Sequence, residues 1–198
     1  MDVSRETFER LKSYEGDVIS WSAKKNLISK GDLETVWSRH ILDCAQLATF
    51  AALDGRWIDL GSGAGLPGVV LALLADKSGF HMTLCEPNGK KASFLRQVCY
   101  RYGLRANVAK TRVEDMHPAE IQDFDFVTAR AFQPLDRLMT LAYPILANDA
   151  RGLFMKGEGA SDEWDEANAD WVLSGELHPA IVSTGSSIAV IDAVQRRS

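Results

Sequence analysis

A glycine-rich bend near residue 60 carries the strongest chemical signal in the chain. Residues 57–68 read WIDLGSGAGLPG, in which a short apolar strand (Trp57–Leu60) leads through the bend into an apolar helix, Val69 to Ala75. Glycines permit positive φ and let a ligand approach the backbone where a Cβ would collide. Pro67 suits a first helical turn, where a backbone N–H would have no partner. The pattern predicts a cofactor-binding turn between a strand and a helix.

Asp59 helps to distinguish two classes of cofactor. Gly63, Gly65 and Gly68 also match the dinucleotide fingerprint GxGxxG, but that match is weak by itself. Loops that cradle pyrophosphate usually follow an apolar residue or a glycine, whereas a carboxylate repels phosphate and suits the cationic methionyl end of S-adenosylmethionine. The order of an acid, an apolar residue and the glycines from Gly61 to Gly65 therefore favours S-adenosylmethionine over NAD(P), and either cofactor over a purely structural turn.

Acidic residues after the next two strands extend the candidate cofactor site. Glu86 ends the second strand, where an acid in such folds accepts hydrogen bonds from both ribose hydroxyls. NAD would use the same carboxylate, so Glu86 indicates a nucleoside without choosing one; the alternative is a surface carboxylate. Val113 and Glu114 follow the third strand, where folds of this class hold adenine between apolar contacts and a polar group. A solvated acidic turn is the alternative there.

The segment after the fourth strand narrows the reaction. Residues 128–134 read TARAFQP and lack the Asp/Asn-Pro-Pro-aromatic motif that activates exocyclic amines of adenine or cytosine. Methylation of carbon five of a pyrimidine needs a cysteine nucleophile beside the cofactor. Cys44, Cys85 and Cys99 lie elsewhere, and Cys85 is expected inside a strand. Both chemistries are therefore disfavoured.

Guanine N7 is an acceptor with an available lone pair, so its methylation needs position and orientation but no base. Arg130, a cation with a planar donor fork, is the candidate catalytic residue, because it could orient the guanine carbonyl edge, a phosphate or the cofactor carboxylate. Phe132 could stack on a base. The alternative is a surface ion pair for Arg130 and a core position for Phe132.

The histidines do not predict a metal centre. His40 lies three residues before Asp43 on a predicted helix, so we expect the two side chains to share a face and to pair there. His81, His117 and His178 are scattered, with no histidine and carboxylate at the spacing of metal ligands. We expect no catalytic metal.

The hydrophobic periodicity predicts the elements that must position these residues. Residues 1–52 are expected to be helical apart from a turn-rich loop at 26–32. Short strands then alternate with helices and predict a parallel sheet with crossover helices; the strands are expected at 57–60, 81–85, 107–110, 124–129 and 152–155. Two further strands, Ala180–Ser183 and Ile188–Asp192, are separated by too few residues for a parallel crossover and predict an antiparallel hairpin.

These elements together predict an α/β fold of the Rossmann-like class I methyltransferase type. We expect a mostly parallel seven-stranded sheet with a late antiparallel strand, preceded by N-terminal helices. The chain of 198 residues suits one domain, with a helical extension at 1–52 and a Rossmann-like core at 53–198. The longest apolar run, Val69 to Ala75, is too short to span a membrane, and no targeting segment is apparent. We expect a soluble, cytoplasmic protein with reduced thiols, and a monomer by default.

Charge is unevenly distributed along a chain whose net charge is −5. The segment 86–112 holds seven basic residues and one acid, Glu86; the basic residues are Lys90, Lys91, Arg96, Arg101, Arg105, Lys110 and Arg112. The segment 158–176 holds seven acids and no Lys or Arg. This split could give one face that attracts phosphate and another that repels it, or two ordinary solvated helix faces.

Several motifs in unbroken order resemble the RsmG (GidB) family, which methylates guanine N7 in bacterial 16S ribosomal RNA. The resemblance covers about residues 20–160, and its motifs are Asn26-Leu27, RHILD at 39–43, DLGSGAGLPG at 59–68, GKK at 89–91 with Phe94-Leu95, RAF at 130–132 and Lys156-Gly157. It implies S-adenosylmethionine as the cofactor and 16S ribosomal RNA, or the small ribosomal subunit, as the partner. The chain departs from many members at Ser186-Ser187 and at Asp192, where they carry basic residues.

The resemblance also implies roles for individual residues. The cofactor contacts of the family fall on Gly61, Leu66, Val113, Glu114 and Arg130, and Glu86 takes the ribose position. Charge and neighbourhood make a second set candidates for contacts with RNA: Arg39, His40, Lys90, Lys91, Arg96 and Lys156, with Phe132 as the stacking residue. The alternatives are a methyltransferase of a small molecule or protein, an NAD(P)-dependent oxidoreductase, and a nucleotide-binding module without catalysis.

Overall fold

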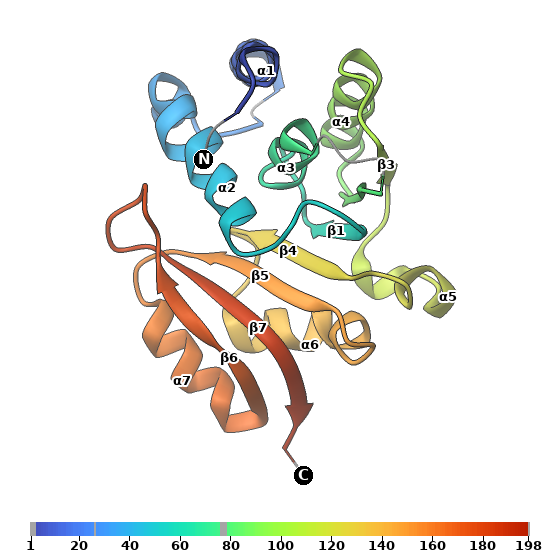
Figure 1. Ribbon diagram of the computed structural model, residues 1–198, viewed down its shortest axis with the longest axis vertical. Helices are drawn as coiled ribbons and strands as arrows, with labels where there is room; N and C mark the ends of the chain where they lie inside the picture. The colour runs from blue at the N-terminus through green and yellow to red at the C-terminus, as the bar shows by residue number, and fades with distance from the viewer. Residues whose placement is uncertain (1–2, 26, 76–78, 198) are drawn as a thin grey trace.

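In the computed structural model, which describes residues 3–25, 27–75 and 79–197, one sheet runs through the molecule (Figure 1). Its strand order is β3-β2-β1-β4-β5-β7-β6. The strands are β1 (Arg56–Leu60), β2 (His81–Cys85), β3 (Ala106–Ala109), β4 (Phe126–Arg130), β5 (Arg151–Lys156), β6 (Trp171–Pro179) and β7 (Ser187–Arg196). Strands β1 to β5 pair in parallel, whereas β7 pairs antiparallel with both β5 and β6. The predicted fold class is confirmed.

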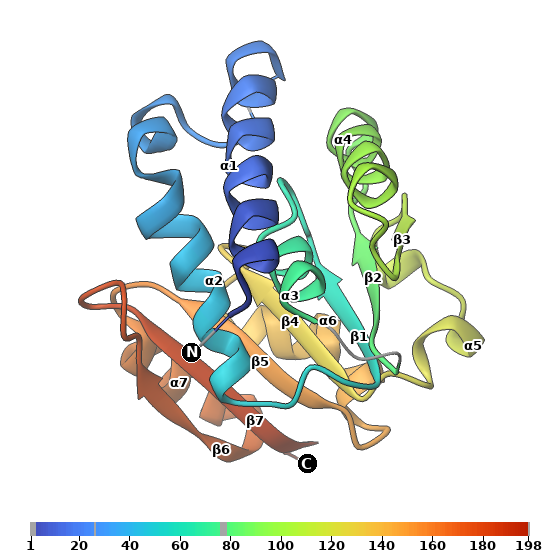
Figure 2. The same ribbon diagram turned by 45° about the horizontal axis from the view of Figure 1, so that its top comes forward.

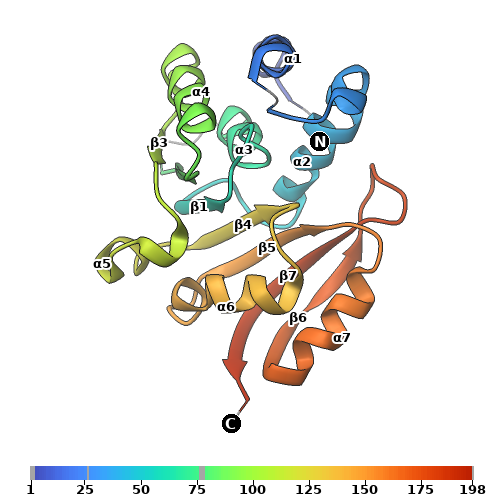
Figure 3. The same cartoon turned by 180° about the vertical axis from the view of Figure 1, so that it is seen from behind.

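Helices cover both faces of the sheet, as Figures 1 and 3 show from opposite sides. The helical elements before β1 are α1 (Arg5–Lys25), η1 (Lys30–Thr35), η2 (Val36–Leu42), α2 (Asp43–Ala45) and η3 (Gln46–Thr49). Those after β1 are α3 (Gly68–Leu74), α4 (Gly89–Arg101), η4 (Val113–Asp115), α5 (Pro118–Ile121), α6 (Leu135–Leu146) and α7 (Ala160–Asp170). The N-terminal elements lie on one side with α3 and α4, and α6 and α7 lie on the other.

Alternation along the strands places one apolar cluster on each face of the sheet. In β1, Trp57 packs with the cluster under α1, α3 and α4, whereas Ile58 packs with the cluster under α6 and α7. Successive side chains of a strand point to opposite faces, and a parallel sheet covered on both faces is buried on both. The carboxyl ends of β1, β2 and β4 therefore emerge from a rigid centre, which is where the predicted site residues lie.

The segment from residue 33 to residue 49 is helical, as predicted, but the helical structure already begins at residue 30, within the predicted loop, and its type changes along the chain. A 3-10 helix (η1) is followed by a π-helix (η2), a short α-helix (α2) and another 3-10 helix (η3). π-Helical turns are rare and often occur at functional sites. Here the π-helix carries Arg39 and His40, and it ends beside Asp43. Asn26, the first residue of the family-like motifs, lies outside the described residues.

The prediction for the last hairpin is right in topology and wrong in position. Residues 180–186 form the connection rather than a strand, and the strand that pairs with β7 is β6, at Trp171–Pro179. Ile181 and Val182 have a strand-like composition but are exposed in the connection. There the Ile181 N–H donates to Gln46 Oε1 at 2.8 Å, which ties the connection to the N-terminal helices. Figure 2 shows the hairpin tip next to them.

The last strand is longer than predicted, because β7 continues beyond the expected end at Asp192 to Arg196. The Asp192 carboxylate pairs with Arg151 of β5 at 2.6 Å. No helix within residues 3–25, 27–75 and 79–197 is both long enough and apolar enough to cross a membrane.

Candidate active site

The glycine loop, residues 61–68, follows β1 and bends with positive φ at three glycines. The φ values are 67° at Gly61, 58° at Gly63 and 90° at Gly65. A Cβ at Gly61 would collide with the ring of Phe132, and one at Gly65 would collide with Val69 and the Tyr14 hydroxyl. At Gly63, by contrast, the one described neighbour within 4 Å of a Cβ is the Gly61 carbonyl oxygen, at 3.7 Å. Gly63 is therefore the glycine that faces open space and could receive a ligand.

Asp59 lies beneath the glycine loop and is fully buried. Its Oδ1 accepts from the Thr128 hydroxyl at 3.0 Å, and its Oδ2 accepts from the Gly68 N–H at 3.2 Å. Burial raises the pKa of Asp59 to about 7 despite these hydrogen bonds. The carboxyl group thus joins β1, β4 and the start of α3, and it supports the loop from below rather than lining its open side.

Glu86 closes the glycine loop from the end of β2. The side chain is buried, Oε2 accepts from the Gly63 N–H at 2.8 Å, and Oε1 accepts from the Asn88 N–H at 2.7 Å. Asn88 in turn caps α4 by accepting from the Lys90 and Lys91 N–H groups. Each carboxylate oxygen has two lone-pair sites, so Glu86 can still accept from a diol. The loop and the carboxylate predicted for the ribose are adjacent.

The segment after β3 lies at the same end of the sheet. Val113 is buried in the cluster under α6, and Glu114 is exposed next to it in η4. The Cys85 thiol donates to the Thr111 carbonyl at 3.2 Å, and burial raises the pKa of Cys85 to about 12. This cysteine is a buried free thiol inside β2, where the sequence predicted it.

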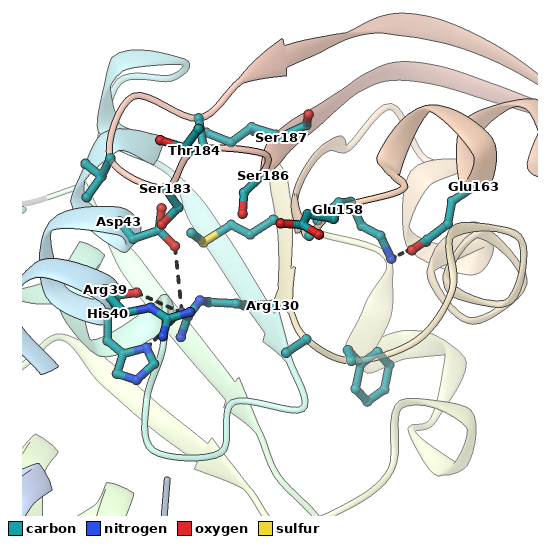
Figure 4. Close-up of a pocket in the computed structure, with 18 of the residues that line it drawn as sticks. Arg39, His40, Asp43, Arg130, Glu158, Glu163, Ser183, Thr184, Ser186 and Ser187 are labelled. Atoms are coloured by element: carbon teal, nitrogen blue, oxygen red, sulfur yellow. Dashed lines mark hydrogen bonds and ion pairs between the residues drawn. The ribbon is translucent and has the colours of Figure 1, made fainter. Parts of the chain in front are cut away.

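Arg130, the last residue of β4, connects the sheet to the N-terminal helices. One terminal nitrogen donates to the Arg39 carbonyl at 3.0 Å, lies 2.8 Å from His40 Nδ1, and lies 3.7 Å from Asp43 Oδ2. His40 and Asp43 were predicted to pair with each other, but the structure places Arg130 in contact with both (Figure 4). The sequence could not reveal this cluster because Arg130 and His40 are 90 positions apart.

The turn after Arg130 directs Phe132 toward the glycine loop. Ala131 has a φ of 49°, a left-handed conformation that L residues other than glycine seldom adopt. Phe132 is half-buried, and its ring packs where a Cβ of Gly61 would lie. Backbone strain of this kind persists where surrounding contacts impose it, and it often marks functional turns. Arg130 and Phe132 thus face two different sides of the same turn.

A cavity of about 1040 Å³, here called the β4–β5 cavity, opens beyond Arg130 at the carboxyl ends of these two strands. Five of the predicted site residues line it: Arg39, His40, Arg130, Phe132 and Lys156. The other lining residues include Asp32 and Asp43 of the N-terminal elements, the β4–α6 and β5–α7 turns, and the connection between β6 and β7 with Ser183 and Ser186 (Figure 4). Sequence reasoning did not anticipate the contribution of that connection, nor of Asp32.

Lys156 is a structural cation rather than an exposed one. Its ammonium donates to the Gln133 carbonyl at 2.7 Å and pairs with Glu163 at 2.5 Å. Glu163 also accepts from the Leu135 N–H at 2.8 Å. The pair fixes the turn that carries Phe132 and the start of α6. An ammonium held in this way is not free to reach phosphate.

The predicted RNA-binding residues fall into two separate groups. Lys90, Lys91 and Arg96 lie on α4, where Lys90 and Arg96 are exposed and Lys91 is half-buried. Arg39, His40, Phe132 and Lys156 lie at the β4–β5 cavity instead. Arg39 is exposed and pairs with Asp32 at 3.6 Å. Within the described residues, no cluster of His, Cys, Asp and Glu has an arrangement that could hold a metal ion.

The family model described as GidB, rRNA small subunit methyltransferase G, matches residues 7–191. The chain belongs to this family. The Ribosomal RNA small subunit methyltransferase G of Parvibaculum lavamentivorans is 42% identical over 181 residues, which cover 90% of this chain and 80% of that protein. The protein of the same name from Brucella canis is 41% identical over 197 residues, 99% of this chain and 92% of that one. The predicted family is thus confirmed.

Solved structures with a similar fold have much lower sequence identity. A SAM-dependent O-methyltransferase of Thermotoga maritima is 16% identical with a TM-score of 0.56, covering 79% of this chain and 67% of that one. A mutant of MtNAS in complex with S-adenosylmethionine is 16% identical with a TM-score of 0.57, covering 93% of this chain and 72% of that one. At this identity the likeness concerns the fold. It agrees with the Rossmann-like α/β fold described above.

Proposed function

We propose that this chain uses S-adenosylmethionine to methylate N7 of a guanine in small-subunit (16S) ribosomal RNA. The observation that carries the proposal is the family membership over residues 7–191, together with near full-length relatives named as ribosomal RNA small subunit methyltransferases. The geometry supports the cofactor part, because Gly63 faces open space beside Glu86 at the carboxyl ends of the strands. Ligands of open α/β sheets bind at this edge.

The residues present fit a sulfonium nucleoside. Glu86 would accept from the ribose hydroxyls, Val113 and Glu114 would flank the adenine, and Gly61 to Leu66 would contact the methionyl part through the backbone. Arg130 would orient the cofactor carboxylate or the guanine from the far side. Asp59 would support the glycine loop from beneath without contacting the cofactor, because its carboxyl group is hydrogen-bonded to Thr128 and Gly68.

The chemistry requires little from the protein beyond position. S-adenosylmethionine supplies an electrophilic methyl group, and guanine N7 supplies a lone pair, so the acceptor loses no proton before it is methylated. The protein accelerates such a step by holding the acceptor in line and excluding water. Phe132, at the turn between the glycine loop and the β4–β5 cavity, has the position to stack on the base.

RNA contacts are proposed for the exposed cations. Arg39 at the rim of the cavity and Lys90, Lys91 and Arg96 on α4 would bind phosphate, since cations that contact the backbone give affinity without sequence preference. His40 and Lys156 are assigned differently from the sequence-based expectation. Lys156 is held in an ion pair, and His40 is buried, so neither would meet the phosphate backbone.

The test is transfer of label from S-adenosylmethionine to RNA. The full chain is incubated with methyl-labelled S-adenosylmethionine and either unmodified 16S ribosomal RNA or small subunits that lack the modification, and strand cleavage at N7-methylguanine maps the product. We expect label at one guanine in at least one of the two substrates, with a rate that falls steeply with salt. Absence of label in both substrates, or label in another base, would contradict the proposal.

A further inference from the structure

The exposed side of α4 carries cations and no acid. From Lys90 to Tyr100, the exposed residues of this helix are Lys90, Ser93, Arg96, Gln97 and Tyr100, here called the α4 face. Side chains three or four positions apart are neighbours on a helix surface, so these residues form one continuous strip. The sequence of the helix contains no Asp or Glu. The α4 face is therefore a basic strip with an aromatic ring at its far end.

The cations of the α4 face are not neutralised by carboxylates. Neither Lys90 nor Arg96 has an ion pair with any residue that the structure describes. Lys110, also without an ion pair in the described part of the chain, lies close by: a Cβ on Gly89 would be 3.3 Å from its Cε and 3.5 Å from its Nζ. Its ammonium therefore lies against the start of α4. Three unpaired cations along one helix attract phosphate even though the net charge of the chain is −5.

Tyr100 contributes nothing visible to the fold. Its side chain is 89% exposed, and no described residue forms a hydrogen bond or a ring contact with it. Tyr102, two positions further on, is half-buried instead, and its hydroxyl donates to Asp17 of α1 at 2.7 Å. Apolar surface stabilises a fold only where it is removed from water. The ring of Tyr100 is thus available to a partner, whereas that of Tyr102 belongs to the packing between α1 and α4.

The α4 face begins next to the candidate cofactor site. Glu86 accepts from the Asn88 N–H, and Asn88 caps the first turn of α4. An α-helix rises about 1.5 Å per residue, so the face extends about 15 Å from Lys90 to Tyr100. Figures 1 and 2 show α4 at the outer edge of the molecule, beside the edge strand β3. A polymer whose reacting base lies at the cofactor can therefore continue outward along this helix.

We propose that the α4 face binds an unpaired stretch of the RNA substrate, with phosphates on Lys90, Arg96 and Lys110 and one base stacked on Tyr100. This inference rests on the proposed function, which makes RNA the partner, and it adds that the RNA is single-stranded at this surface. Cations that follow the backbone, combined with an aromatic platform, are the usual means of holding single strands. In a duplex each base is covered by its neighbours, so its face is not available to a tyrosine ring.

The ring favours RNA over an acidic peptide as the occupant. The carboxylates of a peptide would be satisfied by the cations alone, whereas each nucleotide brings a phosphate together with a flat base. The α4 face offers both kinds of contact within about one turn, because Arg96 and Tyr100 are neighbours on the helix. Stacking tolerates any base, so this contact adds affinity without selecting a sequence. The choice of the methylated guanine is left to the site at the carboxyl ends of the strands.

The experiment separates stacking from charge. Dissociation constants are measured by filter binding for an unstructured RNA strand and for the duplex that it forms with its complement, at several salt concentrations. For Tyr100→Ala we expect the affinity for the single strand to fall about fivefold to a hundredfold. The affinity for the duplex should not change. The slope of log affinity against log salt should also stay the same, because no cation is lost.

Matched variants test whether the ring itself is the contact. Tyr100→Phe keeps the ring and should bind as the unaltered protein does, whereas Tyr100→Leu keeps an apolar side chain without a π face and should behave like Tyr100→Ala. Gln97→Ala, on the same strip, should change the affinity little. Because Tyr100 is 89% exposed, urea denaturation should give the same midpoint for every Tyr100 variant. The affinity for S-adenosylhomocysteine should be unchanged as well.

Three results would overturn the inference. If Tyr100→Ala binds the single strand as tightly as the unaltered protein, or loses as much affinity for the duplex, no unpaired base stacks on Tyr100. If Tyr100→Leu retains full affinity, the contact is apolar and not a stacking one. If polyglutamate competes as strongly as the RNA strand, the face serves acidic proteins. Methylation is measured separately: a protein that binds RNA through Tyr100 and produces no N7-methylguanine would refute the proposed function and leave the RNA-binding surface standing.

Discussion

The glycine loop and the β4–β5 cavity lie on either side of Arg130 and differ in how their polar groups are satisfied. At the loop, Asp59 and Glu86 already accept from backbone N–H groups and from a hydroxyl of the protein. At the cavity, His40 Nε2 is buried without a partner among the described residues. The first region is held in shape before any ligand arrives, whereas the second keeps one buried donor without a partner among the described residues.

The difference suggests that the two regions bind different molecules. A preorganised loop suits a cofactor that is the same in every turnover, because no ordering has to occur on binding. The β4–β5 cavity has no residue of the glycine loop in its described lining, so it suits a second molecule, the methyl acceptor. If the two regions differ in this way, substitutions in each should have distinct consequences for stability, cofactor affinity and RNA binding.

Gly65→Ala should give the largest loss of stability. Gly65 has a φ of 90°, and a Cβ there would collide with Val69 and the Tyr14 hydroxyl, which itself donates to the Ala64 carbonyl at 2.5 Å. Strained backbone and overpacking together should cost about 2–5 kcal/mol of the free energy of unfolding. Urea denaturation measures it. Gly157→Ala is the control, because the described residues leave open space there; an equal loss in both variants would show that the loop is not rigid.

Asp59→Asn should flatten the dependence of stability on pH. Because burial raises the pKa of Asp59 to about 7, the folded protein holds a proton that the unfolded chain has released above pH 4. The stability from this group is therefore present at low pH and is lost as the pH rises through about 7. Between pH 5 and pH 8 the free energy of unfolding of the unaltered protein should fall relative to that of the variant by on the order of 2–3 kcal/mol. A constant difference would mean that Asp59 is ionised throughout.

Glu86→Ala should weaken S-adenosylhomocysteine binding about tenfold to a hundredfold, because a carboxylate that bonds the ribose would be lost. Calorimetry measures the dissociation constant. Glu114→Ala is the matched control, since that carboxylate is exposed and should give a smaller change. Equal effects of the two variants would remove the special role of Glu86, and tight NAD(P) binding would contradict the choice of cofactor.

Removal of cations on α4 should have the smallest effect on the rate of methyl transfer, but it should clearly change how the affinity for RNA depends on salt. Lys90→Gln combined with Arg96→Gln should reduce the slope of log affinity for RNA against log salt by about 2, one for each phosphate contact. Filter binding at several salt concentrations measures the slope. Arg137→Gln, an exposed position on α6, should leave it unchanged. An unchanged slope in the double variant would mean that these cations of α4 do not contact the RNA backbone.

The sequence predicted the elements whose signals are local. The hydrophobic periodicity of a strand can be recognised within about ten residues, as can the glycine loop and the family motifs. Strands β1 and β2 accordingly lie within a residue of their expected bounds. The edge strand β6 was missed because its residues alternate between half-buried and exposed, so it lacks a strong apolar run. The apolar, β-branched run at 180–183 attracted the assignment instead, although its Ile181 is 76% exposed.

The site was predicted in its parts but not in its arrangement. Arg130 and His40 were each singled out as candidates, yet their contact joins positions 90 apart and depends on how η2 packs over β4. Lys156 was expected at the RNA because of its charge, but tertiary structure supplies Glu163 as its partner. Side-chain pairing across the fold decides which cations remain free, and a single sequence does not contain that information.

A structure of the chain bound to S-adenosylhomocysteine would show which of the two regions receives the cofactor. We predict the nucleoside at the glycine loop, with the ribose hydroxyls on Glu86 and the adenine beside Val113, and with the β4–β5 cavity left free for the base. A nucleoside in the β4–β5 cavity would contradict this placement.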